Sequence, residues 1–220
     1  MPGSPSFTVS YVTSSAFKRE ECQVLCSTAR LNDGRLLGEA ISFEFREATI
    51  VETLEVDIAR MVEAEVLSAY YAIKIPCIVE HAGLIFDDYR VNSYPGGLTK
   101  PMWDTLGDRF IAETNSGGRR VMARAVVGYC DGKRIRSFVG ERAGKIANAP
   151  RGQRSFYWDT VFIPDDPRQA EPLLTYAEIV ESDSLGLPYK MGLSQSGIAL
   201  LKFAEYALRE ENKPALWQYV

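Results

Sequence analysis

Histidine and cysteine are scarce in this chain, which has one histidine, His81, and 4 cysteines among 220 residues. A site built from several imidazoles is therefore excluded. Cys22 and Cys26 stand four positions apart on an expected helix, too far apart for a CxxC redox pair, and no histidine accompanies them. We expect the cysteines to be free thiols, buried or partly buried.

Long apolar runs and an excess of positive charge are also missing. No stretch approaches the length of a membrane span, and the N-terminus lacks the apolar core of a signal peptide, so we expect a cytoplasmic protein with no membrane partner. The formal net charge of -4 disfavours general nucleic-acid binding. The sequence contains neither the phosphate-binding pattern GxxxxGKS/T nor the GxSxG elbow of serine hydrolases. An anionic ligand would need a local cluster of Lys and Arg.

The composition is ordinary for a soluble globular protein, with 46% hydrophobic and 25% charged residues. The length suits one sizeable core, so we expect a single domain over residues 1–220, with a frayed N-terminus at 1–6. The C-terminal tail, 211–220, ends in Trp217-Gln218-Tyr219-Val220. Such an apolar, aromatic end either packs on its own domain or docks on another chain.

Hydrophobic periodicity predicts alternating strands and helices, and hence one α/β domain. The expected strands are Phe7–Thr13, Ala40–Phe45, Pro76–Val79, a strand through Phe86 after a turn at Ala82-Gly83, and a hairpin of Arg119–Tyr129 with Arg134–Val139. The expected helices are Phe17–Ala29, Val51–Ile73, Pro101–Glu113 and Ser194–Arg209. The first strand, loop and helix would place hydroxyls and N–H groups at a helix N-terminus, which suits a phosphate.

The most informative segment is the turn Ala149-Pro150-Arg151-Gly152 followed by Phe156-Tyr157-Trp158-Asp159. Phe156 can stack on a flat heteroaromatic ring, and Asp159 can accept hydrogen bonds from ring N–H groups. Arg151 can meet a charge or a carbonyl oxygen nearby. The alternative is a core strand preceded by a turn.

Several further motifs join this segment in a fixed order along the chain. In sequence order they are Thr13-Ser14-Ser15-Ala16-Phe17-Lys18, Phe45-Arg46-Glu47, Arg60, Tyr94-Pro95-Gly96-Gly97-Leu98-Thr99-Lys100, Pro150-Arg151-Gly152, Phe156-Tyr157-Trp158-Asp159, and Lys190 with Ser194. In the order and spacing of these motifs, from about Phe7 to Leu208, the chain resembles the inosine triphosphate pyrophosphatase family.

The resemblance implies an elongated mixed sheet with flanking helices, in two lobes around a central cleft for a purine nucleoside triphosphate. It further implies Mg²⁺, cleavage between the α and β phosphates to a nucleoside monophosphate and pyrophosphate, and a homodimer. The substrate-binding residues it suggests are Thr13, Ser15, Lys18, Arg60, Lys100, Arg151, Phe156, Trp158, Asp159, Lys190, Ser194 and Gln195. It suggests Glu47 and Glu80 as metal ligands, and Glu80 and His81 as catalytic residues.

The residue types support nucleotide binding on their own account. Lys18, Arg60, Lys100 and Lys190 are candidate cations for a triphosphate in a chain of negative net charge. Each of them, taken singly, could equally be a solvated surface charge.

The chain departs from the family at the catalytic signature, which resembles Glu80-His81-Ala82-Gly83-Leu84 here. His81 replaces the aspartate regarded in the family as metal ligand or base, and imidazole is a poor ligand for Mg²⁺. Losing a general base costs about 10²- to 10⁴-fold in rate. Ser194-Gln195-Ser196 also replaces Ser-His-Arg, so that Arg151 or Arg154 would have to address the base. Tyr157 stands in place of the usual glycine and narrows the platform for the base.

Three hypotheses follow from this pattern of retained and lost residues. The first is a sensor or regulatory subunit that binds a non-standard purine triphosphate of the ITP, dITP or XTP type with weak or no hydrolysis. By analogy only, it would signal to a protein effector in bacterial phage defence. The second is an active, Mg²⁺-dependent pyrophosphatase, with His81 as base or with Glu80 and Asp87 holding the metal. The third is a paralogue that binds no nucleotide.

Overall fold

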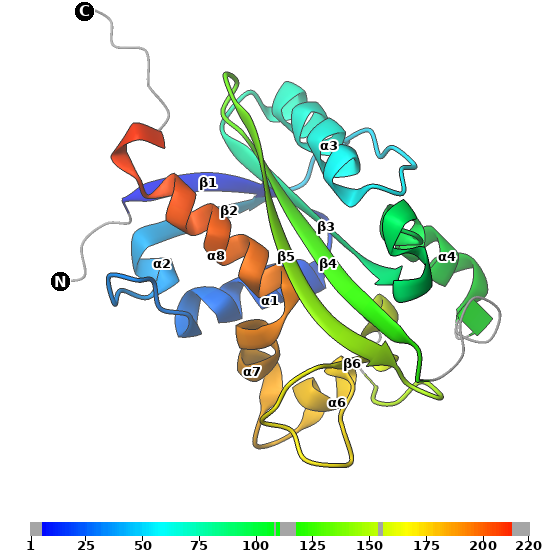
Figure 1. The fold of residues 1–220 in the computed structure, drawn as a ribbon. Helices are drawn as coiled ribbons and strands as arrows, with labels where there is room; N and C mark the ends of the chain where they lie inside the picture. Colours follow the sequence, from blue (N-terminus) through cyan, green and yellow to red (C-terminus); the bar gives the residue numbers. More distant parts are fainter. Residues whose placement is uncertain (1–5, 108, 111–117, 154–155, 213–220) are drawn as a thin grey trace, which may run out of the picture.

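A computed structural model describes residues 6–107, 109–110, 118–153 and 156–212 (Figure 1). Its centre is a six-stranded mixed sheet in the order β2-β1-β3-β4-β5-β6. The strands are β1 (Phe7–Val12), β2 (Ile41–Arg46), β3 (Cys77–Phe86), β4 (Arg120–Cys130), β5 (Ile135–Ile146) and β6 (Phe162–Pro164). β1 pairs in parallel with β2 and β3, and the remaining neighbours are antiparallel. The expected mixed α/β fold is therefore confirmed.

Helices flank both faces of this sheet. They are α1 (Ala16–Thr28), α2 (Leu37–Ala40), α3 (Ile58–Ile73), α4 (Thr99–Leu106), α6 (Tyr176–Glu181), α7 (Gly186–Leu193) and α8 (Gln195–Ala207). Short 3₁₀ turns span Asp87–Asn92, Gly96–Leu98, Tyr157–Thr160 and Glu210–Asn212. None of the helices within the described ranges is long and apolar enough to cross a membrane.

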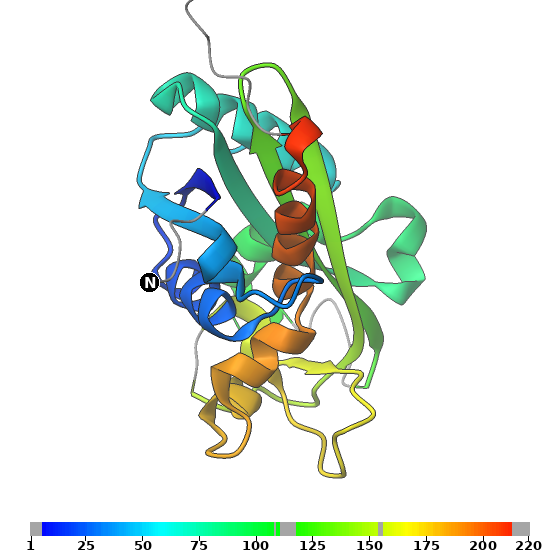
Figure 2. The ribbon, with the colours of Figure 1, turned by 90° about the vertical axis from the view of Figure 1, so that its left-hand side faces the viewer.

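The long strands β3 and β4 are buried on both faces because their apolar residues alternate between two helices. Val79 and Val126 pack with α3, whereas Ile78 and Val127 pack with α8 and α1. Figures 1 and 2 show α3 and α8 on opposite sides of the strands. Each such side chain contributes roughly 1.5–3 kcal/mol to stability by its burial. These two helices therefore stabilise the core at this end of the long strands.

A second core lies toward the other end of the long strands. Leu84 and Phe86 of β3 pack there with Trp158, Phe162 and Tyr176. The long strands extend from the first core into the second, which gives the expected two lobes. The centre of β3 thus lies between them, where residues Glu80 to Ala82 border both.

The sequence prediction for the helix Val51–Ile73 was wrong at its start. The helix begins at Ile58, because the side chain of Asp57 caps it by accepting a hydrogen bond from the N–H of Ala59. The preceding segment, 51–57, is not helical.

The turn expected at Ala82-Gly83 is also absent, and β3 runs unbroken through it. A Cβ on residue 83 would overlap the carbonyl oxygen of Gly96. Glycine is required here by this close approach and not by a turn. Thr99 completes the contact, because its hydroxyl accepts from the N–H of Leu84 at 2.9 Å and donates to the carbonyl of Gly96 at 2.6 Å.

Other expected boundaries need smaller corrections. The helix predicted for Pro101–Glu113 spans Thr99–Leu106 and ends at Gly107, whose φ of 58° is left-handed. Ser194 caps the closing helix and is not its first residue. The 4 cysteines are free thiols, as expected. Most of the predicted frayed N-terminus and of the C-terminal tail, and Arg154, lie outside the described residues.

Candidate functional site

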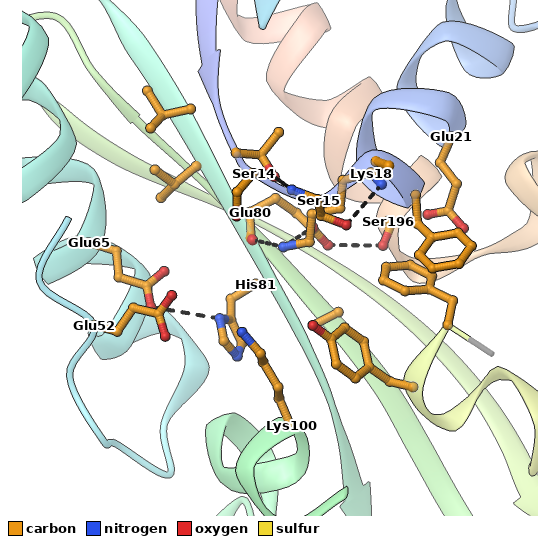
Figure 3. A pocket seen from close by; sticks show the side chains of 18 of the residues that line it. Ser14, Ser15, Lys18, Glu21, Glu52, Glu65, Glu80, His81, Lys100 and Ser196 are labelled. Carbon is orange, nitrogen blue, oxygen red and sulfur yellow. Dashed lines mark hydrogen bonds and ion pairs between the residues drawn. The ribbon is translucent and has the colours of Figure 1, made fainter. Parts of the chain in front are cut away.

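A cavity of about 560 Å³ opens between the two lobes, against the centre of β3 (Figure 3). Segments far apart in the sequence line it: the β1–α1 loop, the segment before α3, β3, the 3₁₀ turn after Phe156, and the α7–α8 junction. The structure places these sequence-predicted residues in its lining: Thr13, Ser15, Lys18, Glu80, His81, Lys100, Phe156, Trp158, Asp159, Lys190, Ser194 and Gln195.

The β1–α1 loop presents the first turn of α1 to this cavity. The hydroxyl of Thr13 accepts from the N–H of Ser15 at 3.1 Å, and the hydroxyl of Ser15 accepts from the N–H of Lys18 at 3.3 Å. Ser15 is therefore the N-cap that starts α1. The cap orients the turn that carries Lys18 toward β3.

Lys18 binds strand β3 through Glu80. Its Nζ lies 2.9 Å from Glu80 Oε2 and also donates to the Glu80 carbonyl oxygen, while Ser196 donates to Oε1 at 3.0 Å. Burial alone would raise the pKa of Glu80, but the charge and hydrogen bond of Lys18 outweigh it and lower that pKa. Burial would likewise lower the pKa of Lys18, and Glu80 raises it instead. Both carboxylate oxygens of Glu80 are thus engaged.

His81 faces a carboxylate that the sequence analysis missed. Its Nδ1 lies 3.7 Å from Glu65 Oε1 of α3, and Figure 3 shows His81 between Glu65 and Lys100. Burial, reinforced by the positive charge of Lys18, lowers the pKa of His81 to about 4. Burial raises the pKa of Glu65 to about 7. Both groups are therefore shifted toward their neutral forms.

A periodicity signal could have identified Glu65. It lies four residues after Met61 and four before Ala69 on the buried face of α3. An acidic residue on an apolar stripe is a candidate for a site. Glu52, from the segment before α3, also lines the cavity and lies near Glu65 in Figure 3.

Lys190 is held by two carboxylates at the other end of the cavity. Its Nζ lies 2.5 Å from Asp159 Oδ2 and 2.7 Å from Glu21 Oε1, and all three residues are buried. Burial would lower the pKa of Lys190, but the two carboxylates outweigh it and raise that pKa. The sequence analysis did not select Glu21, although it lies three residues after Lys18 on the same helix.

Aromatic rings stand beside this ion network. Phe156 stacks on Phe17, with ring centroids 4.8 Å apart and an interplanar angle of 25°. Tyr157 also lines the cavity, in the left-handed region at a φ of 46°, a conformation that favours glycine. Trp158 is 5% exposed and packs on Phe162 and Tyr176, so it supports the wall more than it offers a free face.

Three sequence-predicted residues do not line the cavity. Arg60 is exposed, because the buried stripe of α3 turns it outward, and the helix presents the carboxylate of Glu65 where the resemblance predicted a cation. Arg151 donates to the Leu173 carbonyl at 2.7 Å and lies 3.2 Å from Glu178. Glu47 has an exposed side chain outside the lining.

The residues present do not fit a protein-held Mg²⁺. Glu47, a predicted ligand, has a side chain that is 68% exposed and pairs with Arg19 at 2.5 Å. Glu80 is bound by Lys18 and Ser196. Within the described ranges no three His, Cys, Asp or Glu residues group as ligands for a metal ion.

Two junction residues complete the lining as structural groups. Ser194 accepts from the N–H of Gly197 at 3.1 Å as the cap of α8, and Gln195 accepts from the hydroxyl of Tyr176 at 3.1 Å. Both are buried. Gln195 thereby ties the α7–α8 junction to Tyr176 of α6.

The family model described as the Ham1 family matches residues 9–206. The chain belongs to the Ham1 family. A dITP/XTP pyrophosphatase of Methanopyrus kandleri is 36% identical over 134 residues, 60% of this chain and 64% of that protein, a little under two thirds of its length. Inosine triphosphate pyrophosphatase 1 of Trypanosoma cruzi is 30% identical over 74% of this chain and 79% of its own. The resemblance to the inosine triphosphate pyrophosphatase family is thus confirmed.

Solved structures support the fold. A HAM1 protein from Coxiella burnetii aligns with a TM-score of 0.62 at 16% identity, covering 90% of this chain and 97% of that one. A nucleoside-triphosphatase, named dITP/XTP pyrophosphatase, from Mycobacterium abscessus aligns with a TM-score of 0.59 at 18% identity, covering 89% and 98%. At these identities the likeness concerns the fold.

Proposed function

We propose that this Ham1-family chain binds a non-standard purine nucleoside triphosphate of the ITP, dITP or XTP type in the cavity and hydrolyses it slowly or not at all. The chemistry of the cavity lining carries the proposal. Lysines and aromatic rings line the cavity, while Glu80 is held by Lys18 and Ser196, and His81 has a pKa of about 4.

The binding half of the proposal rests on complementary chemistry. Phe156 offers a face for the base, and Asp159 with Lys190 offers an acceptor and a donor for its edge. Lys18 and Lys100 supply positive charge for the phosphates. A volume of about 560 Å³ falls within the usual range for small-molecule sites. Relatives named as dITP/XTP and inosine triphosphate pyrophosphatases favour such a ligand.

The weak-hydrolysis half rests on the state of Glu80 and His81, the two residues predicted to be catalytic. Attack on a phosphate needs a positioned base and neutralised charge. An imidazole with a pKa of about 4 is a weak proton acceptor at neutral pH, and the Glu80 carboxylate is already hydrogen-bonded. Loss of the general base lowers a rate by about 10²- to 10⁴-fold.

Retained binding without turnover suits a sensor or regulatory subunit, and we extend the proposal to that role. Such a chain would act in the cytoplasm as a homodimer and report the nucleotide to a protein effector. Bacterial phage defence is the setting suggested by analogy with relatives whose catalytic motifs are damaged. Sedimentation velocity with and without ITP tests the assembly, since the role requires a dimer or a ligand-dependent change.

A paired binding and turnover assay tests the function. Purified protein is titrated calorimetrically with ITP, dITP, XTP and ATP, and pyrophosphate release is followed on the same samples with Mg²⁺. We expect binding of ITP-type nucleotides with negligible release. Turnover within the usual enzymatic range of about 1–10³ s⁻¹ would reject the weak-hydrolysis half. No binding of any of the four would reject both halves.

An active pyrophosphatase is the second candidate, because Glu65 lies beside His81. A carboxylate that held Nδ1 would orient the ring and leave Nε2 to accept a proton from water. In that case Glu65→Gln would abolish pyrophosphate release and change its pH profile without weakening the binding of ITP.

A further inference from the structure

Phe17 and Phe156 stack on each other at the end of the cavity that also holds Lys190. We call this the base end. We propose that Phe17 and Phe156 form a two-sided aromatic clamp, with the purine ring bound between them. This inference rests on the proposed function and assigns a base-binding role to Phe17.

The geometry of the pair resembles a closed clamp. The ring planes lie within 25° of parallel and the centroids are 4.8 Å apart. The core pair Trp158–Phe162 instead meets edge to face at 80°. A flat ring held between two others needs a separation of about 7 Å, or two van der Waals contacts. The ring centroids, now 4.8 Å apart, must therefore move apart by roughly 2 Å to admit a base.

The two rings come from separate segments, so they can separate without breaking a helix. Phe17 belongs to the first turn of α1, and Phe156 precedes the 3₁₀ turn Tyr157–Thr160. Both line the cavity. Each is partly exposed, in contrast to Trp158 behind them.

Two polar groups lie close to the clamp. Lys190 Nζ lies 5.4 Å from the centroid of the Phe156 ring and 2.5 Å from Asp159 Oδ2. A carbonyl on the purine can accept from Lys190, and a ring N–H can donate to Asp159. The faces of the base would thus meet carbon, and its edge would meet the ion network.

Phe17 also precedes Lys18, which binds Glu80 of β3. Insertion of a base beside Phe17 therefore acts on the same turn that carries the phosphate cation. The clamp consequently links recognition of the base to the contact between α1 and β3.

The test is calorimetric titration of ITP, with UTP as the smaller ring, into the unchanged protein and into Phe17→Leu, Phe17→Ala and Phe17→Tyr. Tyr71→Ala is the matched control, since Tyr71 is exposed on α3 and does not line the cavity. We expect the Leu and Ala variants to bind ITP about tenfold more weakly, the usual effect of losing one stacked aromatic face. The Tyr variant and the control should bind as the unchanged protein does. The preference for ITP over UTP should shrink in the Leu and Ala variants.

The outcomes separate this inference from the proposed function. Unchanged or tighter ITP binding by both the Leu and Ala variants would overturn the clamp. Tighter binding would mean that the Phe17 side chain blocks the site for the base. Failure of the unchanged protein to bind ITP would overturn the proposed function and the clamp with it. Circular-dichroism melting of each variant verifies folding, and Leu keeps most of the apolar volume if Ala does not fold.

Discussion

The two ends of the cavity treat charge in opposite ways. At the base end, Lys190 is buried with Asp159 and Glu21 as an ion network. Against β3, burial shifts the pKa of His81 down to about 4 and that of Glu65 up to about 7. One end stabilises paired charges, whereas the other shifts two titratable groups toward their neutral forms.

The comparison teaches that binding and chemistry can be separated within one cavity. Fixed charges with fixed partners favour recognition, because their geometry is set before the ligand arrives. Against β3, the imidazole of His81, with a pKa of about 4, is a weak proton acceptor at neutral pH, whereas the carboxyl group of Glu65, with a pKa of about 7, can still accept a proton.

The largest effect is expected at the base end. Lys190→Met leaves Asp159 and Glu21 buried without their cation, which should destabilise the protein by about 3–5 kcal/mol and abolish ITP binding. Urea denaturation measures the first effect and calorimetry the second. The triple variant with Glu21→Gln and Asp159→Asn removes the buried charges and should recover much of the stability. A loss below 1 kcal/mol for Lys190→Met would contradict the ion network.

The next effect concerns hydrolysis. His81→Asp places a carboxylate at the aspartate position of the family, and we expect pyrophosphate release from ITP to rise by about 100-fold or more. His81→Asn, of similar size and without charge, is the control and should give no rise. Equal rates in the two variants would show that the missing carboxylate does not limit turnover.

The pH dependence of stability should expose the Glu65–His81 pair. The folded pKa of Glu65 is raised to about 7, so its contribution to stability falls as pH rises from about 4.5 to 7. The folded pKa of His81 is lowered to about 4, so its contribution rises from about pH 4 to 6.5. Each is on the order of 3 kcal/mol, and the two slopes oppose each other.

Removing one member of the pair should reveal the slope of the other. We expect Glu65→Gln to become more stable relative to its own value at pH 4.5 as the pH approaches 6.5, while the unchanged protein stays nearly flat. Urea denaturation across this range makes the measurement. Parallel curves for the two proteins would mean that Glu65 has no raised pKa.

The smallest effect is expected outside the cavity. Glu47→Gln breaks an exposed ion pair with Arg19, so it should change the free energy of unfolding by no more than about 1 kcal/mol and leave ITP binding intact. Calorimetry with Mg²⁺ and with EDTA makes the comparison. Loss of binding in the variant only when Mg²⁺ is present would place Glu47 in a metal site after all.

Sequence alone could predict what repeats locally along the chain. Alternation and helical spacing predicted the β4–β5 hairpin and the closing helix, and motif order predicted that Lys18, Phe156 and Lys190 belong together. Helical spacing does indicate the buried face of α3, but Arg60 was chosen from motif order, and Glu65 on that face was overlooked. The start of that helix depends on the Asp57 cap, which a periodicity argument ignores.

Contacts between distant segments were the second limit. The stacking of Phe17 on Phe156 joins α1 to a segment near the end of the sheet, and no spacing rule relates the two. The engagement of Glu80 by Ser196 is similar, because it depends on how α8 crosses β3. Residue types indicated the chemistry of the cavity, and only the fold showed which charges are already neutralised.

The missing side chain at Gly83 has a consequence for Lys100. Gly83 of β3 lies directly against the backbone of Gly96, and Thr99 hydrogen-bonds to both segments. The backbone of Lys100, the next residue, is therefore held in place before an anion binds. A ligand then loses less free energy to ordering that segment, and affinity gained in this way requires no additional contact. The absence of a Cβ at Gly83 can thus contribute to the affinity for an anionic ligand.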